Sequence, residues 1–276
     1  MKMTDLTSIG RTIDPEYPTN RAIAVLSIAV MVGGALWQLL SGVRVGEAVV
    51  WGVEAGLTIF LAWALCRELD PDHPMAAFVA VALALPALYV WGLPQLSVIF
   101  WLVVLVRVVN RSVGLPAGVL DALGLVGLGG WLSLQGHWGY GVITALALFL
   151  DSQLPERARR QLVFALLAVI VTVAVAILGN GPTFEGAPSL AGGLMALVLS
   201  LVFVPVILQA REVESVGDHT GEPLRPVRVQ AAQALALSAG VGVGLLGGVS
   251  GVVGLSPLWA ATLGAAIGWV YRLVVG

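Results

Sequence analysis

Ten apolar segments follow one another along this chain, separated by short joins that are polar or contain glycine and proline. The segments are 22–43, 46–66, 75–91, 94–113, 117–136, 139–154, 161–179, 190–210, 229–248 and 255–274. A helix that crosses a bilayer needs about 20 mostly apolar residues, with a usable range of about 17 to 25. The pattern therefore predicts an all-α, polytopic integral membrane protein with about ten transmembrane helices.

The composition excludes several classes of soluble protein. Of the 276 residues, 58% are hydrophobic and 11% are charged, and the mean hydropathy is +0.96, whereas a soluble domain carries about 25% charged residues. A net charge of −2 leaves no basic surface for nucleic acid. The single cysteine, Cys66, excludes a disulfide framework. The three histidines share no local spacing that suits a metal, so we expect neither a metal site nor another cofactor.

The basic residues orient the predicted helices. If the N-terminus is cytoplasmic, then of the 14 lysines and arginines only Arg44 falls on the outer side. This asymmetry is the one that the positive-inside rule describes. We therefore expect both termini to be cytoplasmic, with residues 1–21 forming a cytoplasmic segment that lacks the features of a signal peptide. Residues 22–276 are expected to form a single transmembrane domain in the cell membrane.

One short sequence pattern occurs twice. Residues 11–18 (RTIDPEYP) match residues 67–74 (RELDPDHP), and each copy precedes a helix that runs toward the outer side. This match suggests a hairpin repeat that relates 11–66 to 67–106. Convergent helix capping by Asp and Pro is the alternative interpretation.

Small residues form a strip along each of the last two predicted helices. They recur every four residues and so share one helix face, where another backbone can approach closely. The two strips are Ala232, Ala236, Gly240, Gly244 and Gly248 in one helix, and Ala260, Gly264 and Gly268 in the other. We expect the strips to pack against each other or across a homo-oligomer; a mobile glycine-lined gate is the alternative.

Charged and polar residues gather at the predicted cytoplasmic ends of the helices. They are Arg67, Asp70, Asp72, Arg107, Asn110, Arg111, Asp121 and Asp151. Because Asp121 follows the helix that carries Arg107 and Arg111 after a short turn, an ion pair between Asp121 and one of these arginines is predicted. Carboxylates beside arginines can hold Mg²⁺ and a diphosphate. A solvated rim of charges is the simpler interpretation.

Two fragments of this region carry a resemblance to a known family. Asn110-Arg111-Ser112 with Leu115-Pro116-Ala117-Gly118, and Gly217-Asp218 with Gly221, are similar to pieces of the UbiA-type prenyltransferases. The resemblance implies a membrane enzyme that acts on a lipid or prenyl diphosphate at the cytoplasmic face. The paired aspartate motifs that hold Mg²⁺ in that family are absent from both places, so we predict no catalytic residue.

One carboxylate is predicted within the membrane. Glu54 lies in the segment 46–66, seven residues after Glu47 and on the same helix face. A charged group there costs several kcal/mol unless it is paired, protonated or in contact with water. We expect Glu54 to face the interior of the bundle and to carry a proton for much of the time, with Glu47 at the outer mouth of the same path. A structural hydrogen bond to a neighbouring helix is the alternative.

Three classes of function remain. A small-molecule or ion transporter, proton-coupled through Glu54, is favoured by analogy with other helical membrane proteins. A membrane enzyme at the cytoplasmic face and a non-catalytic scaffold subunit stay open, and an enzyme is the less favoured of these classes. The expected partners are the lipid bilayer and an unidentified small molecule or ion, with no nucleic acid.

Overall fold

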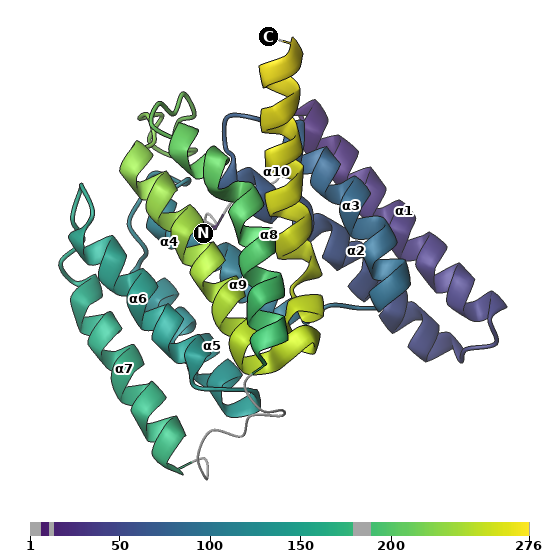
Figure 1. The fold of residues 1–276 in the computed structure, drawn as a ribbon, viewed down its shortest axis with the longest axis horizontal. Coiled ribbons are helices and arrows are strands. Elements are labelled where there is room, and N and C mark those ends of the chain that lie inside the picture. Colours follow the sequence, from purple (N-terminus) through teal and green to yellow (C-terminus); the bar gives the residue numbers. More distant parts are fainter. Residues whose placement is uncertain (1–6, 11–13, 179–188, 276) are drawn as a thin grey trace. The chain divides into compact units, whose positions relative to one another are not determined.

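All the regular elements that the structure describes are α-helices. The computed structural model describes residues 7–10, 14–178 and 189–275. Within these ranges the helices are α1 Pro18–Leu40, α2 Val45–Leu69, α3 Ala76–Trp91, α4 Leu96–Asn110, α5 Val119–Gln135, α6 Gly139–Gln153, α7 Gln161–Leu178, α8 Leu190–Gln209, α9 Pro226–Gly254 and α10 Ser256–Val275. Each predicted apolar segment coincides with one helix, so the all-α prediction with ten helices is confirmed for the described residues (Figure 1). The first copy of the predicted repeat begins at residues 11–13, outside the described residues.

The lengths of these helices make the chain a multi-pass membrane protein. Six of them are long and apolar enough to cross a bilayer: α1, α2, α7, α8, α9 and α10. Three shorter apolar helices, α3, α4 and α5, have 16, 15 and 17 residues. At about 1.5 Å per residue each is roughly 23 to 26 Å long, a little less than the hydrocarbon thickness of about 30 Å.

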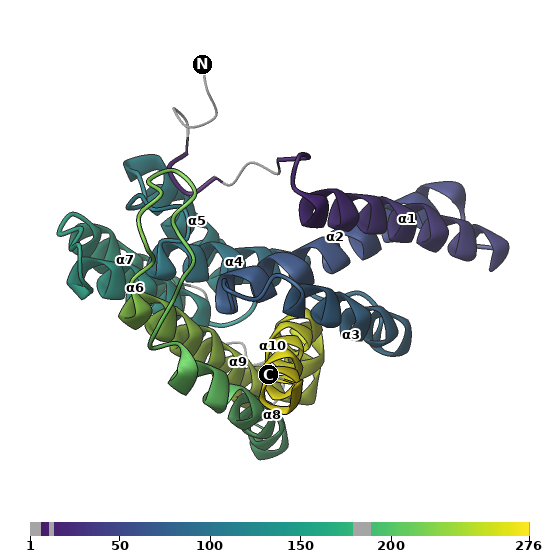
Figure 2. The ribbon, with the colours of Figure 1, turned by 90° about the horizontal axis from the view of Figure 1, so that it is seen from above.

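The chain divides into two compact units. Unit 1 comprises Met1–Arg11 and Trp101–Val252, and unit 2 comprises Thr12–Phe100 and Val253–Gly276. Unit 1 therefore holds α5 to α8 with most of α4 and α9, and unit 2 holds α1 to α3 and α10. Within unit 1, the loop between α8 and α9 reaches back to the turn between α4 and α5 (Figure 2).

Glycines set the packing of the helices in unit 2. In α2, Gly52 and Gly56 face α1, and a Cβ atom at Gly56 would lie 2.7 Å from the carbonyl oxygen of Ser27. In α10, a Cβ atom at Gly264 would lie 2.7 Å from the backbone nitrogen of Ala80 in α3. Both helix pairs approach so closely that a side chain at these positions would displace the neighbouring backbone.

Glycines of the two predicted strips pack against another helix of their own unit. In unit 1, a Cβ atom at Gly244 of α9 would lie 2.8 Å from both the Ala196 Cβ and the Gly192 carbonyl oxygen of α8. In unit 2, Gly264 and Gly268 of α10 lie against α3. Within the units, α8 and α3 thus supply the small residues that face these glycines. Pairing of the two strips with each other or across a homo-oligomer stays a prediction. Gly240 is buried in α9.

Helix α9 extends beyond its predicted end and is broken near it. Gly248 has φ 64° and ψ −154°, a non-helical conformation in the left-handed half of the map that favours glycine. Directly before the break, the Leu245 carbonyl oxygen accepts a hydrogen bond of 3.0 Å from the backbone N–H of Ser189, at the start of α8. Sequence analysis placed the end of this helix at residue 248, where the break lies.

Aromatic rings pack together in unit 1 between α4 and the α5–α6 turn. The Trp101 indole N–H donates to Thr144 Oγ1 at 2.9 Å, and its ring meets Tyr140 edge-on with centroids 5.4 Å apart. Tyr140 stacks on His137, 4.5 Å between centroids. Burial of the His137 imidazole lowers its pKa below the usual value, because the charged form is poorly solvated there.

Candidate functional site: a buried arginine–aspartate cluster and a half-buried glutamate

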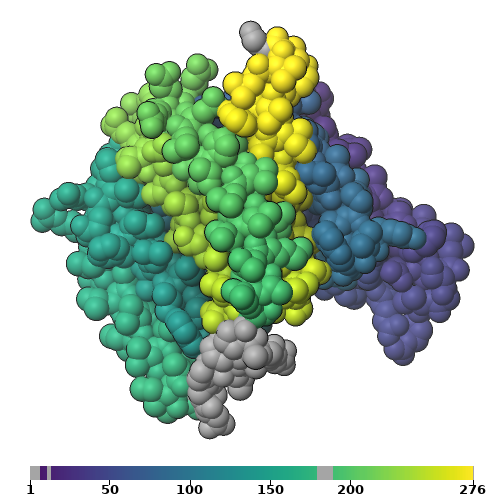
Figure 3. Space-filling model, viewed as in Figure 1, coloured from purple at the N-terminus to yellow at the C-terminus, as the bar shows by residue number. Residues whose placement is uncertain are grey.

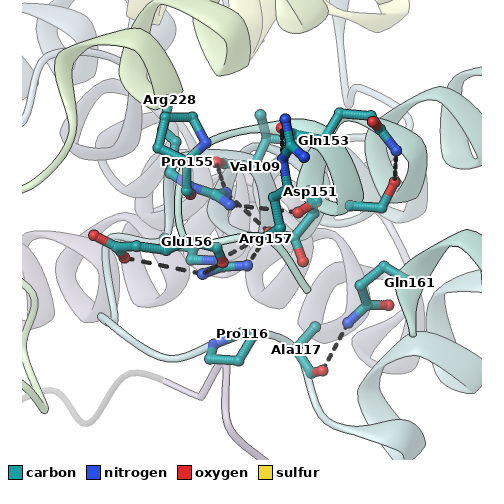
Figure 4. Close-up of polar contacts among 12 residues, drawn as sticks. Val109, Pro116, Ala117, Asp151, Gln153, Pro155, Glu156, Arg157, Gln161 and Arg228 are labelled. Carbon is teal, nitrogen blue, oxygen red and sulfur yellow. Dashed lines mark hydrogen bonds and ion pairs between the residues drawn. The ribbon is translucent and has the colours of Figure 1, made fainter. Parts of the chain in front are cut away.

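A buried carboxylate joins two arginines in unit 1. Asp151, near the end of α6, is fully buried. Its Oδ1 accepts a hydrogen bond of 2.9 Å from Arg111 Nε. The same oxygen accepts a hydrogen bond of 2.9 Å from Arg228 Nη1 (Figure 4). Arg111 directly follows α4 and Arg228 lies in the first turn of α9, and both are buried. The cluster therefore ties together one end each of α4, α6 and α9.

The two guanidinium groups also bind backbone carbonyls at these helix ends. Arg228 donates from Nη1 to the Val109 carbonyl at 2.9 Å and from Nε to the Pro155 carbonyl at 2.8 Å. Arg111 Nη1 donates to the Glu156 carbonyl at 2.7 Å. The last carbonyls of an α-helix have no intrahelical partner. The arginines thus satisfy backbone groups where α4 and α6 end.

Two residues of this region have a left-handed backbone conformation. Arg111 has φ 54° and Glu156 has φ 65°, a region that non-glycine residues occupy only when their surroundings hold them there. The Glu156 carboxylate forms an ion pair of 2.7 Å with Arg225, and both of these side chains are exposed. Side-chain contacts therefore fix the backbone on both sides of the cluster.

The charges of the buried cluster do not cancel. Two guanidinium groups share one carboxylate oxygen, which leaves a formal charge of +1 on Arg111, Asp151 and Arg228. Asp151 Oδ2 and Ser112 Oγ are buried and receive or donate no hydrogen bond among the described residues. Removing one partner of a buried pair costs far more than an exposed pair contributes. The geometry is that of a clamp between helices, with its polar groups sequestered from solvent.

Asp121 takes a different role from the one predicted. It binds the N-terminal segment: its Oδ1 accepts from Thr7 Oγ1 at 2.6 Å and its Oδ2 accepts from Ser8 Oγ at 2.7 Å. The predicted pair with Arg107 or Arg111 was wrong, because Arg111 binds Asp151 and Arg107 Nη1 donates to the Ile9 carbonyl at 3.2 Å. The N-terminal segment supplies donors that sequence analysis did not place near this turn.

The predicted cytoplasmic polar residues belong to both units. Five lie in unit 1: Arg107, Asn110, Arg111, Asp121 and Asp151. Asn110 is fully buried, and its Oδ1 accepts from the Ser112 backbone N–H at 2.9 Å.

The other three, Arg67, Asp70 and Asp72, lie in unit 2 around the α2–α3 turn. Asp70 is 2.6 Å from His73 Nδ1 and 4.0 Å from Arg272 Nη2. In the parts of the chain that the structure describes, no group of three or more His, Cys, Asp or Glu side chains is placed to hold one metal ion.

The two fragments that resemble prenyltransferases lie side by side. The Ser112 carbonyl accepts from the Asp218 backbone N–H at 3.2 Å, and the Val113 carbonyl accepts from the His219 backbone N–H at 3.0 Å. Gly114, with φ 93°, lies at the same contact. Sequence analysis compared these fragments with one family but did not predict that they touch each other.

Glu54 is a half-buried carboxylate in the N-terminal half of α2. Its side chain forms no hydrogen bond or ion pair with any residue that the structure describes, although its carbonyl accepts from Thr58 Oγ1 at 2.8 Å. Glu54 projects from nearly the opposite face to Gly52, which contacts α1. Glu47 is exposed and pairs with Arg44 at the start of the helix.

Arg228 is the main residue that sequence analysis missed. It was counted only among the basic residues of the predicted inner side, yet it is 1% exposed and contacts the ends of both α4 and α6. A signal was present, because Arg228 begins a long apolar helix and has Val227 and Val229 as neighbours. An arginine at that point either extends to the interface or must find a buried partner.

These observations define the class of the protein, a multi-pass α-helical membrane protein with a charged cluster buried at one end of its helices. Comparison with known protein families, curated proteins and solved structures finds no match to this chain.

Proposed function

We propose that this chain is a small-molecule or ion transporter of the cell membrane, with Glu54 as its proton-binding group. The observation that carries the proposal is a carboxylate without a partner among the described residues, well inside an apolar helix. Glu54 lies nine residues after Val45, the first residue of α2. At about 1.5 Å per residue this is roughly 14 Å from the helix end, within the depth of the hydrocarbon.

The face of α2 that carries Glu54 supports this proposal. Glu47, Glu54 and Glu68 recur at intervals of seven or fourteen residues, so they form a line that drifts around the helix by about 20° for every seven residues. Leu61, in the same line, is buried, and so is Glu68 at the far end. From Glu47 to Glu68 the line covers about 32 Å, close to the thickness of a bilayer. The carboxylates are about 10 Å and 21 Å apart along the helix, so passage of a proton between the two surfaces requires water molecules between them.

The orientation that we propose places both termini in the cytoplasm. In unit 1 the end of α4, the start of α5, the end of α6 and the start of α9 meet at one side, as an alternating path through a membrane requires. The arginines of these ends favour the cytoplasmic side. Glu47 then lies near the outer surface and Glu68 near the inner one.

The test is proton-driven uptake by the reconstituted protein across a panel of labelled solutes. Glu54→Gln keeps the size of the side chain and its hydrogen bonding but cannot carry a proton. We expect the wild type to accumulate a solute in response to a pH gradient and the variant to lose that response. Glu212→Gln, which changes an exposed acid in the loop after α8, is the matched control and should transport normally. Gradient-driven uptake that survives in Glu54→Gln would refute the proton-binding role.

A second candidate is a membrane enzyme that acts on a prenyl diphosphate. It is favoured by the contact between the 110–118 and 217–221 fragments, which resemble parts of one enzyme family. Consumption of a prenyl diphosphate that depends on Mg²⁺, by protein in detergent without any gradient, would support this candidate over the transporter.

A further inference from the structure

The loop between α6 and α7 concentrates positive charge at one end of unit 1. Arg157, Arg159 and Arg160 lie within four residues, and all three are exposed. The loop projects from the periphery of the unit, beside the start of α7 (Figures 1 and 3).

Nearby carboxylates do not neutralise these arginines. Arg157 and Arg160 donate to neutral backbone carbonyls, those of Gln153 at 3.2 Å and Ala117 at 2.7 Å. Arg159 makes no side-chain hydrogen bond or ion pair to any described residue. The two acids of the same stretch have other arginines as partners: Asp151 binds Arg111 and Arg228, and Glu156 binds Arg225. Three positive charges therefore remain available to an anion.

Buried neighbours hold this loop in place. The backbone N–H of Ala158 donates to the Asp151 carbonyl at 3.5 Å, so the loop is attached to the buried cluster. Gln161, fully buried at the start of α7, donates from Nε2 to the Ala117 carbonyl at 2.8 Å. Side chains on a fixed backbone lose less conformational entropy when they bind a ligand.

The helix that follows the loop faces lipid. Only 22% of the 18 residues of α7 are buried. Leu162, Val163 and Leu166 in its first turns are 42%, 66% and 58% exposed. An acyl chain that lies along this face would have its headgroup at the level of the arginines, because they immediately precede the helix.

We propose that the segment Pro155–Arg160 binds the headgroups of anionic phospholipids, whose acyl chains lie along α7. The phosphodiester accepts hydrogen bonds from the guanidinium groups, and the net negative charge of the lipid matches the uncompensated positive charge of the loop. This proposal is independent of transport, because it requires no movement of a substrate.

The experiment measures which lipids the purified full-length protein retains. Protein in mixed micelles with equal amounts of phosphatidylglycerol and phosphatidylcholine is repurified, and the bound lipids are quantified by mass spectrometry. We expect enrichment of phosphatidylglycerol on the wild type, weakened by salt. Each arginine near an anionic surface contributes roughly a fivefold preference. Arg159→Gln should therefore lower the enrichment roughly fivefold, and the triple variant Arg157→Gln/Arg159→Gln/Arg160→Gln should abolish it.

The control variant is Arg211→Gln, which removes an exposed arginine from the loop after α8 and should leave the enrichment unchanged. Thermal melting verifies that each variant is folded, and the single substitution keeps the test valid if the triple variant is not. Enrichment that is absent in the wild type, or unchanged in Arg159→Gln, overturns the proposal. Release of the lipid by millimolar glycerol phosphate also overturns it, since the loop would then be a site for a soluble anion.

Discussion

Asp151 is the residue on which the largest single effect on stability is expected. Its carboxylate is the acidic partner of two buried guanidinium groups. Asp151→Asn keeps the shape but removes the charge, and leaves the buried Arg228 without an ion-pair partner and Arg111 with only Glu156 at 4.0 Å. We expect a loss of about 3 to 5 kcal/mol in the free energy of unfolding. Glu156→Gln breaks the exposed pair with Arg225 and only a distant contact of 4.0 Å with Arg111, and should cost about 1 kcal/mol or less. Denaturant titration in detergent measures both; equal losses would contradict the clamp.

His137 gives the protein a stability that depends on pH. Because burial lowers the pKa of its imidazole in the folded state, the unfolded chain binds a proton more readily. Stability is therefore fully present above about pH 6.5 and falls as the pH decreases below that value, by at most about 1.4 kcal/mol per pH unit. His137→Phe keeps an aromatic ring against Tyr140 and removes the titration. Between pH 7.5 and pH 5 the melting temperature should fall more steeply for the wild type than for His137→Phe. An equal fall in the two proteins would contradict this prediction.

At the scale of the helix, the contact between α8 and α9 depends on individual glycines. A Cβ atom at Gly244 would lie 2.8 Å from the Ala196 Cβ, whereas a Cβ atom at Gly242 would meet nothing within 4 Å. Gly244→Ala should lower the melting temperature, because the two backbones must separate. Gly242→Ala should leave it unchanged or raise it slightly, because alanine favours the helix. The comparison fails as evidence for this packing if both substitutions have the same effect.

The positions of the helices could be predicted from the sequence, but the contacts between them could not. Apolar segments of membrane length identified the ten helices that the structure describes, because a backbone in lipid must satisfy its own hydrogen bonds. Periodicity also showed which glycines share a face, but it did not reveal which helix they meet. The contacts of Gly244 with α8 and of Gly264 with α3 depend on the arrangement of the bundle. Similarly, the sequence indicated a polar end of the helices but not that Asp151 would bind Arg228, which is 77 residues away.

For the whole molecule, the decisive prediction is which side of the membrane each loop occupies. The loop that contains Thr220 binds the α4–α5 turn through the backbone of Asp218 and His219, so it lies on the same side as the arginine–aspartate cluster. The basic residues of this side predict that it is cytoplasmic. The α1–α2 turn, with Ser41, follows a single crossing from the predicted cytoplasmic N-terminus and should be outside.

In a Cys66→Ala background, which removes the buried native thiol, Ser41→Cys should react with an impermeant maleimide on intact cells. Thr220→Cys should react only after permeabilisation. Both positions are exposed, so a failure to react reports the side of the membrane and not burial. The reverse pattern would place Glu47 at the inner surface and overturn the orientation, whereas labelling of both positions from outside would contradict the odd number of crossings between them.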